Sequence, residues 1–235
     1  MMDLPFEQFP ALSTIEICRH VFTQRIPGID VLHEKPEVLK RLDAAHREIR
    51  NAIGIGDWPL LTAQQVHGSK IAVVDEVGSA LRADRGRRGA ASLPSREFLG
   101  CDGMITNQRG MMLGVYVADC CAVYILDPKT PAIGLVHSGR KGTELGVVTN
   151  AIKQMVQRFG SDPANMIVQL GPCIRPPHYE IDFAAEIMRQ CRAFGVKEIH
   201  DSAVCTACDL DRYYSYRAEK GKTGRMLALL GVNRG

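Results

Sequence analysis

The alternation of apolar and polar positions along the chain predicts strands that are separated by helices and glycine-rich turns. Runs rich in β-branched and aromatic residues are typical of strands, and four such runs cover 13–25, 115–126, 131–137 and 167–174. Residues 59–78 favour two short strands that meet at His67-Gly68. The stretch 102–128 holds two strand candidates, of which the second is strongly apolar.

Helices are predicted where apolar residues recur every three to four positions. Residues 35–54 have this spacing, with Pro36 near the first turn and Gly54 after the end. Residues 138–160 form a glycine-rich entry into a second helix, and 180–195 predicts an amphipathic third one. Because no repeat and no linker interrupts this order, we expect one α/β domain over residues 1–235.

Arginines gather in residues 78–100, which lack any apolar period. Five of them stand there among Gly, Ala and Ser: Arg82, Arg85, Arg87, Arg88 and Arg96. This composition is typical of a flexible loop, and a solvated basic loop is the main interpretation. Contact with phosphate or nucleic acid is the alternative, because basic runs bind phosphate without sequence information.

Composition narrows the class of protein. The chain has 235 residues, 46% of them hydrophobic, and a net charge of +3, which gives no reason to expect a nucleic-acid or membrane partner. The first residues lack the basic region of a secretory signal, and no apolar run reaches the roughly 20 residues of a membrane span. We therefore expect a cytoplasmic protein whose eight cysteines are core residues, metal ligands or nucleophiles rather than disulfides.

The adjacent thiols of Cys120 and Cys121 raise the first question of chemistry. In a strand over 115–126 they point to opposite faces, so only one can join a given site. His137 ends the next predicted strand, and His67 lies beside a glycine at another strand end. One Cys and two His could form a zinc site with an open fourth position.

Two alternatives to that zinc site stay open at the level of spacing. The three residues could be unrelated, or the thiol of Cys120 or Cys121 and His137 could form a nucleophilic pair whose imidazole is oriented by Asp119 or another polar group. Other signals are weaker. Cys205 and Cys208 form a single CxxC, "GKTGR" lacks the first glycine of a phosphate loop, and "GPCIRPPHYEID" suggests a pocket wall.

Taken in order, six stretches resemble the successive motifs of the YfiH-like family: "QVHG", "CDGMITN", "ADCCAVYILDP", "GLVHSG", "GPCIRPPHYEID" and "YYSYR…KTGR". The family is also known as multicopper polyphenol oxidase, laccase-domain protein or purine nucleoside phosphorylase. The resemblance implies a compact layered α/β (α+β) domain, with a mixed β-sheet core flanked by helices. It also implies zinc bound by His67, Cys120 and His137.

The same resemblance implies a small-molecule substrate. Family activities are phosphorolysis of adenosine, inosine, guanosine and methylthioadenosine, and deamination of adenosine. Asp119, Cys120 and His137 are then the expected catalytic group. Phosphate needs cationic donors, for which the expected residues are Arg25, Lys141, Lys222 and Arg225.

A copper-dependent enzyme that oxidises phenols is one alternative that the family resemblance implies. A Cys-His hydrolase or a peptidoglycan-editing factor is another. The chain departs from the family at "HSGRKG", where Arg140 replaces an aromatic residue and Lys141 an arginine. This departure concerns substrate or phosphate recognition and leaves the three expected metal ligands intact.

Overall fold

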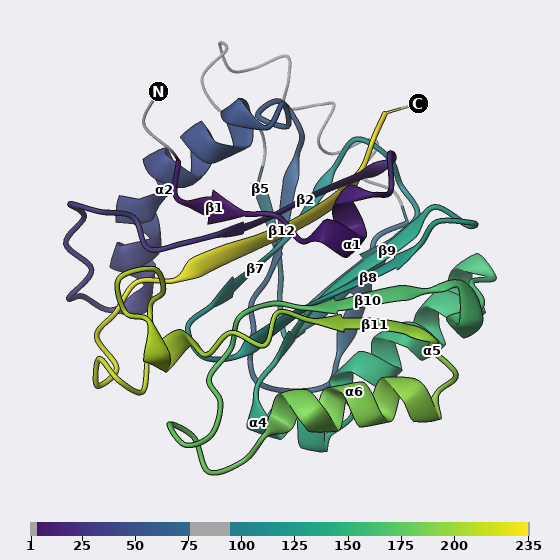
Figure 1. The fold of residues 1–235 in the computed structure, drawn as a ribbon. Helices are drawn as coiled ribbons and strands as arrows, with labels where there is room; N and C mark the ends of the chain where they lie inside the picture. The colour runs from purple at the N-terminus through teal and green to yellow at the C-terminus, as the bar shows by residue number, and fades with distance from the viewer. Residues whose placement is uncertain (1–3, 76–94, 235) are drawn as a thin grey trace.

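Two six-stranded sheets stacked face to face form the centre of the protein, and helices cover their outer faces (Figure 1). The computed structural model describes residues 4–75 and 95–234. The mixed β core flanked by helices is therefore confirmed, with two mixed sheets as its basis.

The first sheet brings the two ends of the chain together. Its order is β1 (Phe6–Glu7), β2 (Cys18–Thr23), β12 (Met226–Val232), β7 (Met112–Val117), β3 (Leu60–Ala63) and β5 (Ser95–Phe98). The last strand, β12, pairs antiparallel with both β2 and β7. By contrast, β3 runs parallel to both of its neighbours, β7 and β5.

The second sheet is built around a hairpin. Its order is β11 (Glu198–Asp201), β10 (Ile167–Leu170), β8 (Cys121–Asp127), β9 (Ala132–Ser138), β6 (Gly103–Thr106) and β4 (Ile71–Val73). The antiparallel pair β8 and β9 begins at Cys121 opposite Ser138, so the segment just before β8 lies beside the end of β9.

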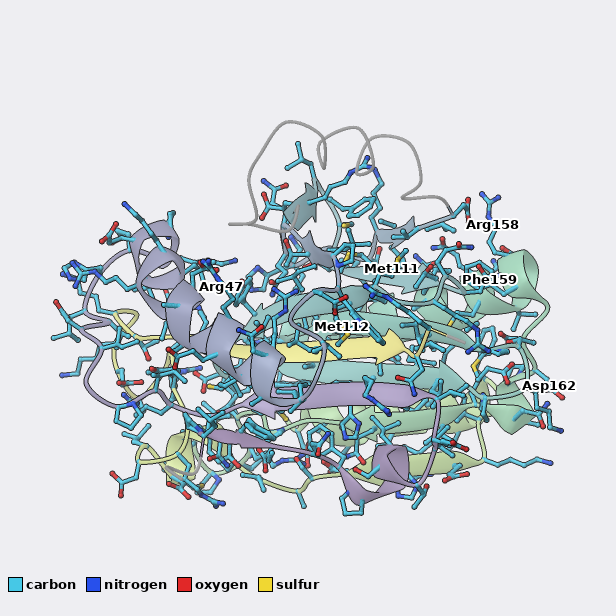
Figure 2. The ribbon with its side chains drawn as sticks, turned by 90° about the horizontal axis from the view of Figure 1, so that it is seen from above. Arg47, Met111, Met112, Arg158, Phe159 and Asp162 are labelled. Atoms are coloured by element: carbon cyan, nitrogen blue, oxygen red, sulfur yellow. The ribbon has the colours of Figure 1, made fainter. Side chains whose placement is uncertain are left out.

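Helices pack on the two outer faces. On the first sheet lies α2 (Lys35–Ala52), while α5 (Val147–Phe159) and α6 (Phe183–Ala193) cover the second. Shorter segments are α1 (Pro10–Ser13), α4 (Arg140–Glu144) and the 3₁₀ turns η1 (Pro163–Asn165) and η2 (Thr206–Cys208). Figure 2 shows Arg47 of α2 at one side of the molecule, and Arg158 and Phe159 at the end of α5 at the other.

Strand alternation divides the core into two parts. On β8, Ala122, Tyr124 and Leu126 point into the core between the sheets, whereas Cys121 and Val123 point toward α5 and α6. All five side chains are fully buried. Burial on both faces explains why this part of the chain reads as a continuous apolar run.

The predicted strand 115–126 is wrong in one respect. The chain leaves the first sheet after Val117 and enters the second at Cys121, and Asp119 in the turn between them has a positive φ of 82°. The alternation that was used to separate the two thiols is therefore interrupted. Cys121 still lies in the core under the helices, while Cys120 belongs to the turn.

Other sequence predictions have mixed outcomes. The helix at 35–54, the two short strands in 59–78 and the helix ends near Gly160 and Gly195 are confirmed. Residues 138–160 form two helices, α4 and α5, rather than one. The strand predicted within 13–25 is shorter than that range and covers β2 alone. The basic loop 78–100 falls mostly outside the described residues, but its last part forms strand β5 instead of a loop. Within the described parts of the chain, no helix is long and apolar enough to cross a membrane.

Candidate metal centre and its pocket

Three connections between the two sheets lie side by side, and they carry most of the candidate site. His67 follows β3, Asp102 follows β5 and Cys120 follows β7, and each of these strands lies in the first sheet while the next lies in the second. Gln65 joins two of the connections, because its backbone N–H donates to the Cys101 carbonyl at 2.9 Å, and its side-chain amide bonds the backbone of Tyr116 in β7. The crossing points thus bring together residues that are distant in the sequence.

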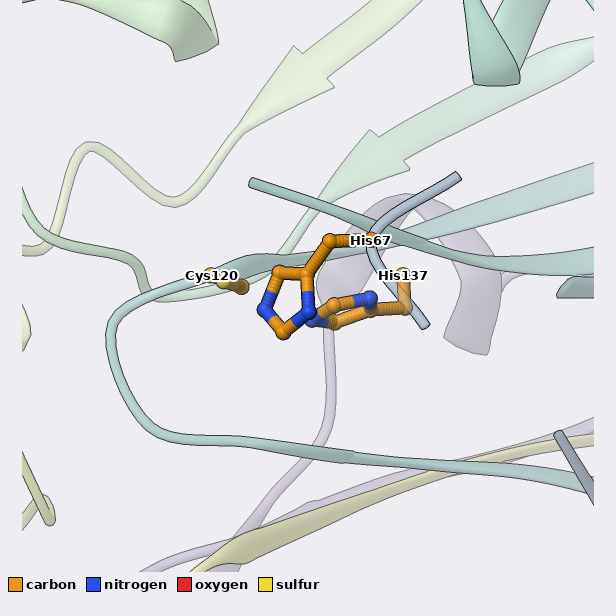
Figure 3. Close-up of side chains that lie close together, drawn as sticks. All are labelled: His67, Cys120 and His137. Atoms are coloured by element: carbon orange, nitrogen blue, oxygen red, sulfur yellow. The ribbon is translucent and has the colours of Figure 1, made fainter. Parts of the chain in front are cut away.

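His67, Cys120 and His137, the three expected metal ligands, meet at this place. Their candidate ligand atoms all lie within 4.8 Å of one another. The imidazole rings of the two histidines cross at 80° with centroids 4.9 Å apart, and Cys120 lies beside the His67 ring (Figure 3). His67 is exposed, Cys120 half-buried and His137 buried, so the group faces solvent on one side.

Asp102 holds two of these residues in place. Its fully buried carboxylate accepts the backbone N–H groups of His67 and Gly68, each at 2.7 Å. The same carboxylate lies 3.0 Å from Nδ1 of His137, and its backbone carbonyl accepts the His137 N–H at 2.7 Å. These bonds fix the His67 backbone at its positive φ of 59° and the His137 ring in one orientation.

The protonation states of His137 and Asp102 suit a metal ligand and the carboxylate that orients it. Burial lowers the pKa of His137, against the hydrogen bond to Asp102, so the imidazole is neutral at pH 7. Burial acts on Asp102 in the opposite direction, but the bonds from His137 and Gly68 keep the pKa of its carboxyl below the ordinary value. When His137 Nδ1–H donates to this carboxylate, Nε2 is left with a free lone pair, which a metal ligand requires.

The Sγ atom of Cys120 is packed against the backbone. A Cβ atom on Gly139 would lie 2.6 Å from it, so any other residue at this position would displace the sulfur. Burial raises the pKa of the Cys120 thiol to about 12. A cation beside the sulfur is the ordinary way to ionise such a thiol.

The donor set therefore fits a metal. One thiolate and two neutral imidazoles are ligands of zinc sites that keep a fourth position for water or substrate. Within residues 4–75 and 95–234, this is the one group of three or more metal-ligating side chains close enough to share an ion. Cys205 and Cys208 belong to no such group there.

A pocket of about 840 Å³ opens beside the three residues. Five cationic side chains line it, against the two acids Asp119 and Glu144: Lys35, Arg140, Lys141, Arg217 and Arg225. Four rings also line it: Tyr116, Tyr179, Phe183 and Tyr216. Since Tyr179 and Ile174 come from "GPCIRPPHYEID", the prediction that this stretch forms a pocket wall is confirmed.

Two of the four expected phosphate donors do not reach the pocket. Arg25 forms an ion pair with Glu219 at 2.9 Å and lies over the ring of Tyr214, while Lys222 is exposed outside the pocket lining. Lys141 and Arg225 do line it.

Lys35, at the start of α2, is a pocket cation that the sequence analysis missed. Burial, and after it the charge of Arg225, lower the pKa of Lys35, so these two cations are electrostatic neighbours. Arg225 donates to two backbone carbonyls, those of Thr223 and Gly224. Among the described residues neither side chain has an ion-pair partner, which leaves their charges available to an anion.

Asp119 is a junction between loops. Its Oδ1 accepts a hydrogen bond from the Thr206 hydroxyl at 2.8 Å, and its Oδ2 accepts one from the backbone N–H of Arg217 at 2.7 Å. Its backbone carbonyl accepts the N–H of Ile174 at 2.9 Å. Both carboxylate oxygens are thus engaged, and the turn that presents Cys120 is tied to two other walls of the pocket.

Comparison with known proteins identifies the family of the chain. A family model described as multi-copper polyphenol oxidoreductase laccase matches residues 33–189 and 178–233. The chain belongs to this family. Its relatives include purine nucleoside phosphorylase YlmD of Geobacillus stearothermophilus, which is 28% identical over 224 residues and covered at 78% in both chains. Purine nucleoside phosphorylase SCO2081 of Streptomyces coelicolor is 28% identical over 209 residues, covering 77% of this chain and 79% of the relative.

Two solved structures share the fold of this chain. The crystal structure of YlmD from Geobacillus stearothermophilus superposes with a TM-score of 0.78 at 23% identity, covering 97% of this chain and 99% of that one. The structure of YfiH from Bacillus licheniformis gives 0.73 at 22% identity, covering 92% and 93%. The resemblance that was stated from the motifs alone is therefore confirmed.

Proposed function

We propose that this protein is a zinc-dependent enzyme that cleaves purine nucleosides with phosphate. The observation that carries the proposal is a His-Cys-His group at the edge of a pocket that is also lined by aromatic rings and cations. The names of the relatives support the reaction class. Adenosine, inosine, guanosine and methylthioadenosine are the proposed substrates, and deamination of adenosine is a second activity of the same pocket.

The rings of the pocket suit a purine base. Tyr116, Tyr179 and Tyr216 present flat apolar surfaces with polar hydroxyls, as small-molecule sites commonly do. Binding in this pocket would orient the ribose so that its anomeric carbon faces the bound phosphate. Orientation of this kind lowers the barrier because the reacting atoms meet in one complex.

Lys35 and Arg225 are the proposed inorganic-phosphate site, with Lys141 near them in the pocket lining. In phosphorolysis a phosphate oxygen forms a bond to the anomeric carbon while the bond to the purine nitrogen breaks, and the base leaves with a proton. Two cations that line one pocket, neither paired with a carboxylate in the described parts of the chain, would bind the dianion and hold it for this attack. Asp119 acts as a positioning residue, since its two hydrogen bonds keep the Cys120 turn against the pocket.

His67, Cys120 and His137 would hold the zinc ion. When bound, the ion supplies a Lewis acid at the edge of the pocket, the chemistry that deamination by activated water also needs. Zinc is favoured over a multicopper centre because several coppers need several ligand sets, and the described residues contain one.

A Cys-His hydrolase remains the second candidate, because Asp102, His137 and Cys120 stand in the order of an orienting acid, an imidazole and a thiol. The additional imidazole of His67 in the same group favours the metal instead.

Metal analysis combined with a phosphate-dependent turnover assay tests the proposal. We expect about one zinc per chain and conversion of inosine and adenosine only when phosphate is present. Cys120→Ser should lose zinc and turnover, while Cys208→Ser, at an exposed thiol outside the group, should lose neither. Turnover by metal-free protein, or a thiol that reacts with hydrolase inhibitors in place of binding zinc, would contradict the proposal.

A further inference from the structure

The pocket has a second pair of cations at its rim, formed by Arg140 and Arg217. Arg140 begins α4, and Arg217 lies in the loop between η2 and β12. Glu180, in the loop before α6, joins them: its Oε1 lies 3.5 Å from Nη1 of Arg140 and its Oε2 3.2 Å from Nη2 of Arg217. The two guanidinium groups are therefore placed so that one anionic group can contact both.

The ring of Tyr179 supports this arrangement from inside the pocket. The guanidinium of Arg217 lies 4.8 Å from the centroid of that ring, within the range of a cation–π contact. Tyr179 itself lines the pocket, and its neighbour Glu180 carries the bridging carboxylate. An anion between Arg140 and Arg217 would consequently lie beside the ring of Tyr179, one of the aromatic side chains that line the pocket.

The bridging carboxylate is easily replaced. The side chains of Arg140, Glu180 and Arg217 are 50%, 56% and 54% exposed, and ion pairs at such exposure contribute little. A phosphate monoester carries close to two negative charges at pH 7, against one for Glu180, and guanidinium groups bind phosphate in a bidentate manner. A phosphate on the ligand would therefore compete well for the place that Glu180 occupies.

The number of cations in the pocket also supports a second anion site. One inorganic phosphate uses the pair Lys35 and Arg225, so Arg140 and Arg217, whose partners in the structure are the exposed acids Glu144 and Glu180, are left for a second anion. We infer that the rim binds a phosphate group that belongs to the substrate itself, so that a phosphorylated purine nucleoside binds in preference to the free nucleoside. This inference rests on the proposed function, because it assumes that the pocket holds a purine.

The test compares inosine 5′-monophosphate with inosine, by turnover and by calorimetric binding to the zinc-loaded protein, both at saturating inorganic phosphate. We expect a KM and a Kd at least tenfold lower for the monophosphate, and an advantage that shrinks as KCl is raised. Arg140→Gln and Arg217→Gln should each remove most of the ratio between the two ligands, and Glu180→Gln should increase it several-fold. Arg189→Gln, at an exposed arginine that pairs with Glu186 outside the pocket, should leave the ratio unchanged.

The outcomes separate this inference from the proposed function. If inosine is cleaved but the monophosphate binds no better at saturating inorganic phosphate, the inference is wrong and the proposed function stands. If neither ligand is cleaved but the monophosphate binds with the expected dependence on Arg140, the rim site stands and the reaction class fails. If neither ligand binds, both are overturned.

Discussion

The Nδ1 atom of His137 lies 3.0 Å from Oδ1 of Asp102, and this contact is buried at both ends. The carboxylate also accepts two backbone N–H groups, so three donors share it. An amide at this position offers one acceptor oxygen and adds two donors, and one of the three bonds is lost. We predict that Asp102→Asn lowers zinc affinity by about 10- to 100-fold, as measured by competition with a chromophoric chelator.

Asp43→Asn is the matched control for Asp102→Asn, since Asp43 lies on the exposed face of α2 and pairs with Arg47. It should bind zinc as the unchanged protein does. An Asp102→Asn protein with full zinc affinity would show that His137 does not need its buried partner.

Gly139 provides a second prediction about the same centre. A methyl group there would lie 2.6 Å from Sγ of Cys120, and the sulfur would have to move. We predict that Gly139→Ala folds but binds zinc at least tenfold more weakly, in the same chelator competition.

The control for crowding at Gly139 is Gly54→Ala. Gly54 has a positive φ of 74°, and a methyl group added there would meet nothing within 4 Å among the described residues, so its substitution strains the backbone without touching the site. It should cost about 1 kcal/mol in urea unfolding and leave zinc affinity unchanged. Equal zinc affinities in the two variants would mean that the Cys120 sulfur is free to shift.

Lysines 35 and 222 make a matched pair for the phosphate site. Lys35 lines the pocket beside Arg225, and Lys222 is exposed outside it. We predict that Lys35→Met raises the KM for inorganic phosphate at least tenfold and that Lys222→Met leaves it unchanged, in steady-state kinetics with inosine. The reverse result would restore the assignment that was made from the sequence.

Local signals explain what could be predicted from the sequence. Helix α2 could be predicted from the spacing of Val38, Leu42 and Ile49 and from Gly54 after its end. Both signals are local, because periodicity and capping act within one helix. His67 is a candidate because it lies beside Gly68 at a strand end, and His137 because its strand ends in a glycine-rich turn. The motif order then identified the family, but spacing alone could not choose between a metal site and a nucleophilic pair.

What the sequence did not reveal depends on pairing between distant segments. β12 finds its partners in β2, about 200 residues away, and in β7, and no local pattern specifies such a pairing. The change of sheet at Asp119 is also hidden in the sequence, because the strands on both sides of it are apolar and read as one continuous run. Asp102 and Lys35 were missed because an acid before a strand and a lysine at a helix start are ordinary on the surface. Only the tertiary structure shows that one is buried and that the other faces the pocket.

Buried His46 on α2 makes stability depend on pH. Its ring packs against Tyr116 and is 3% exposed, and among the described residues neither ring nitrogen has a hydrogen-bond partner. Burial lowers the pKa of His46 to about 4, against the charge of Asp43, which raises it. Below pH 6.5 the unfolded chain therefore takes up a proton that the folded chain does not, and the free energy of unfolding falls as the pH drops toward 4.

We predict that His46→Leu removes this loss. Between pH 7 and pH 5 the variant should lose about 2 kcal/mol less unfolding free energy than the unchanged protein, because a shift of one pKa unit corresponds to about 1.4 kcal/mol. At pH 7 it should be as stable or more stable, since leucine buries no unsatisfied polar atom. His20, whose pKa burial also lowers to about 4, remains in the variant, so some dependence on pH persists. Urea unfolding at both pH values measures the difference, and an unchanged loss in His46→Leu would mean that this imidazole is already protonated or solvated in the fold.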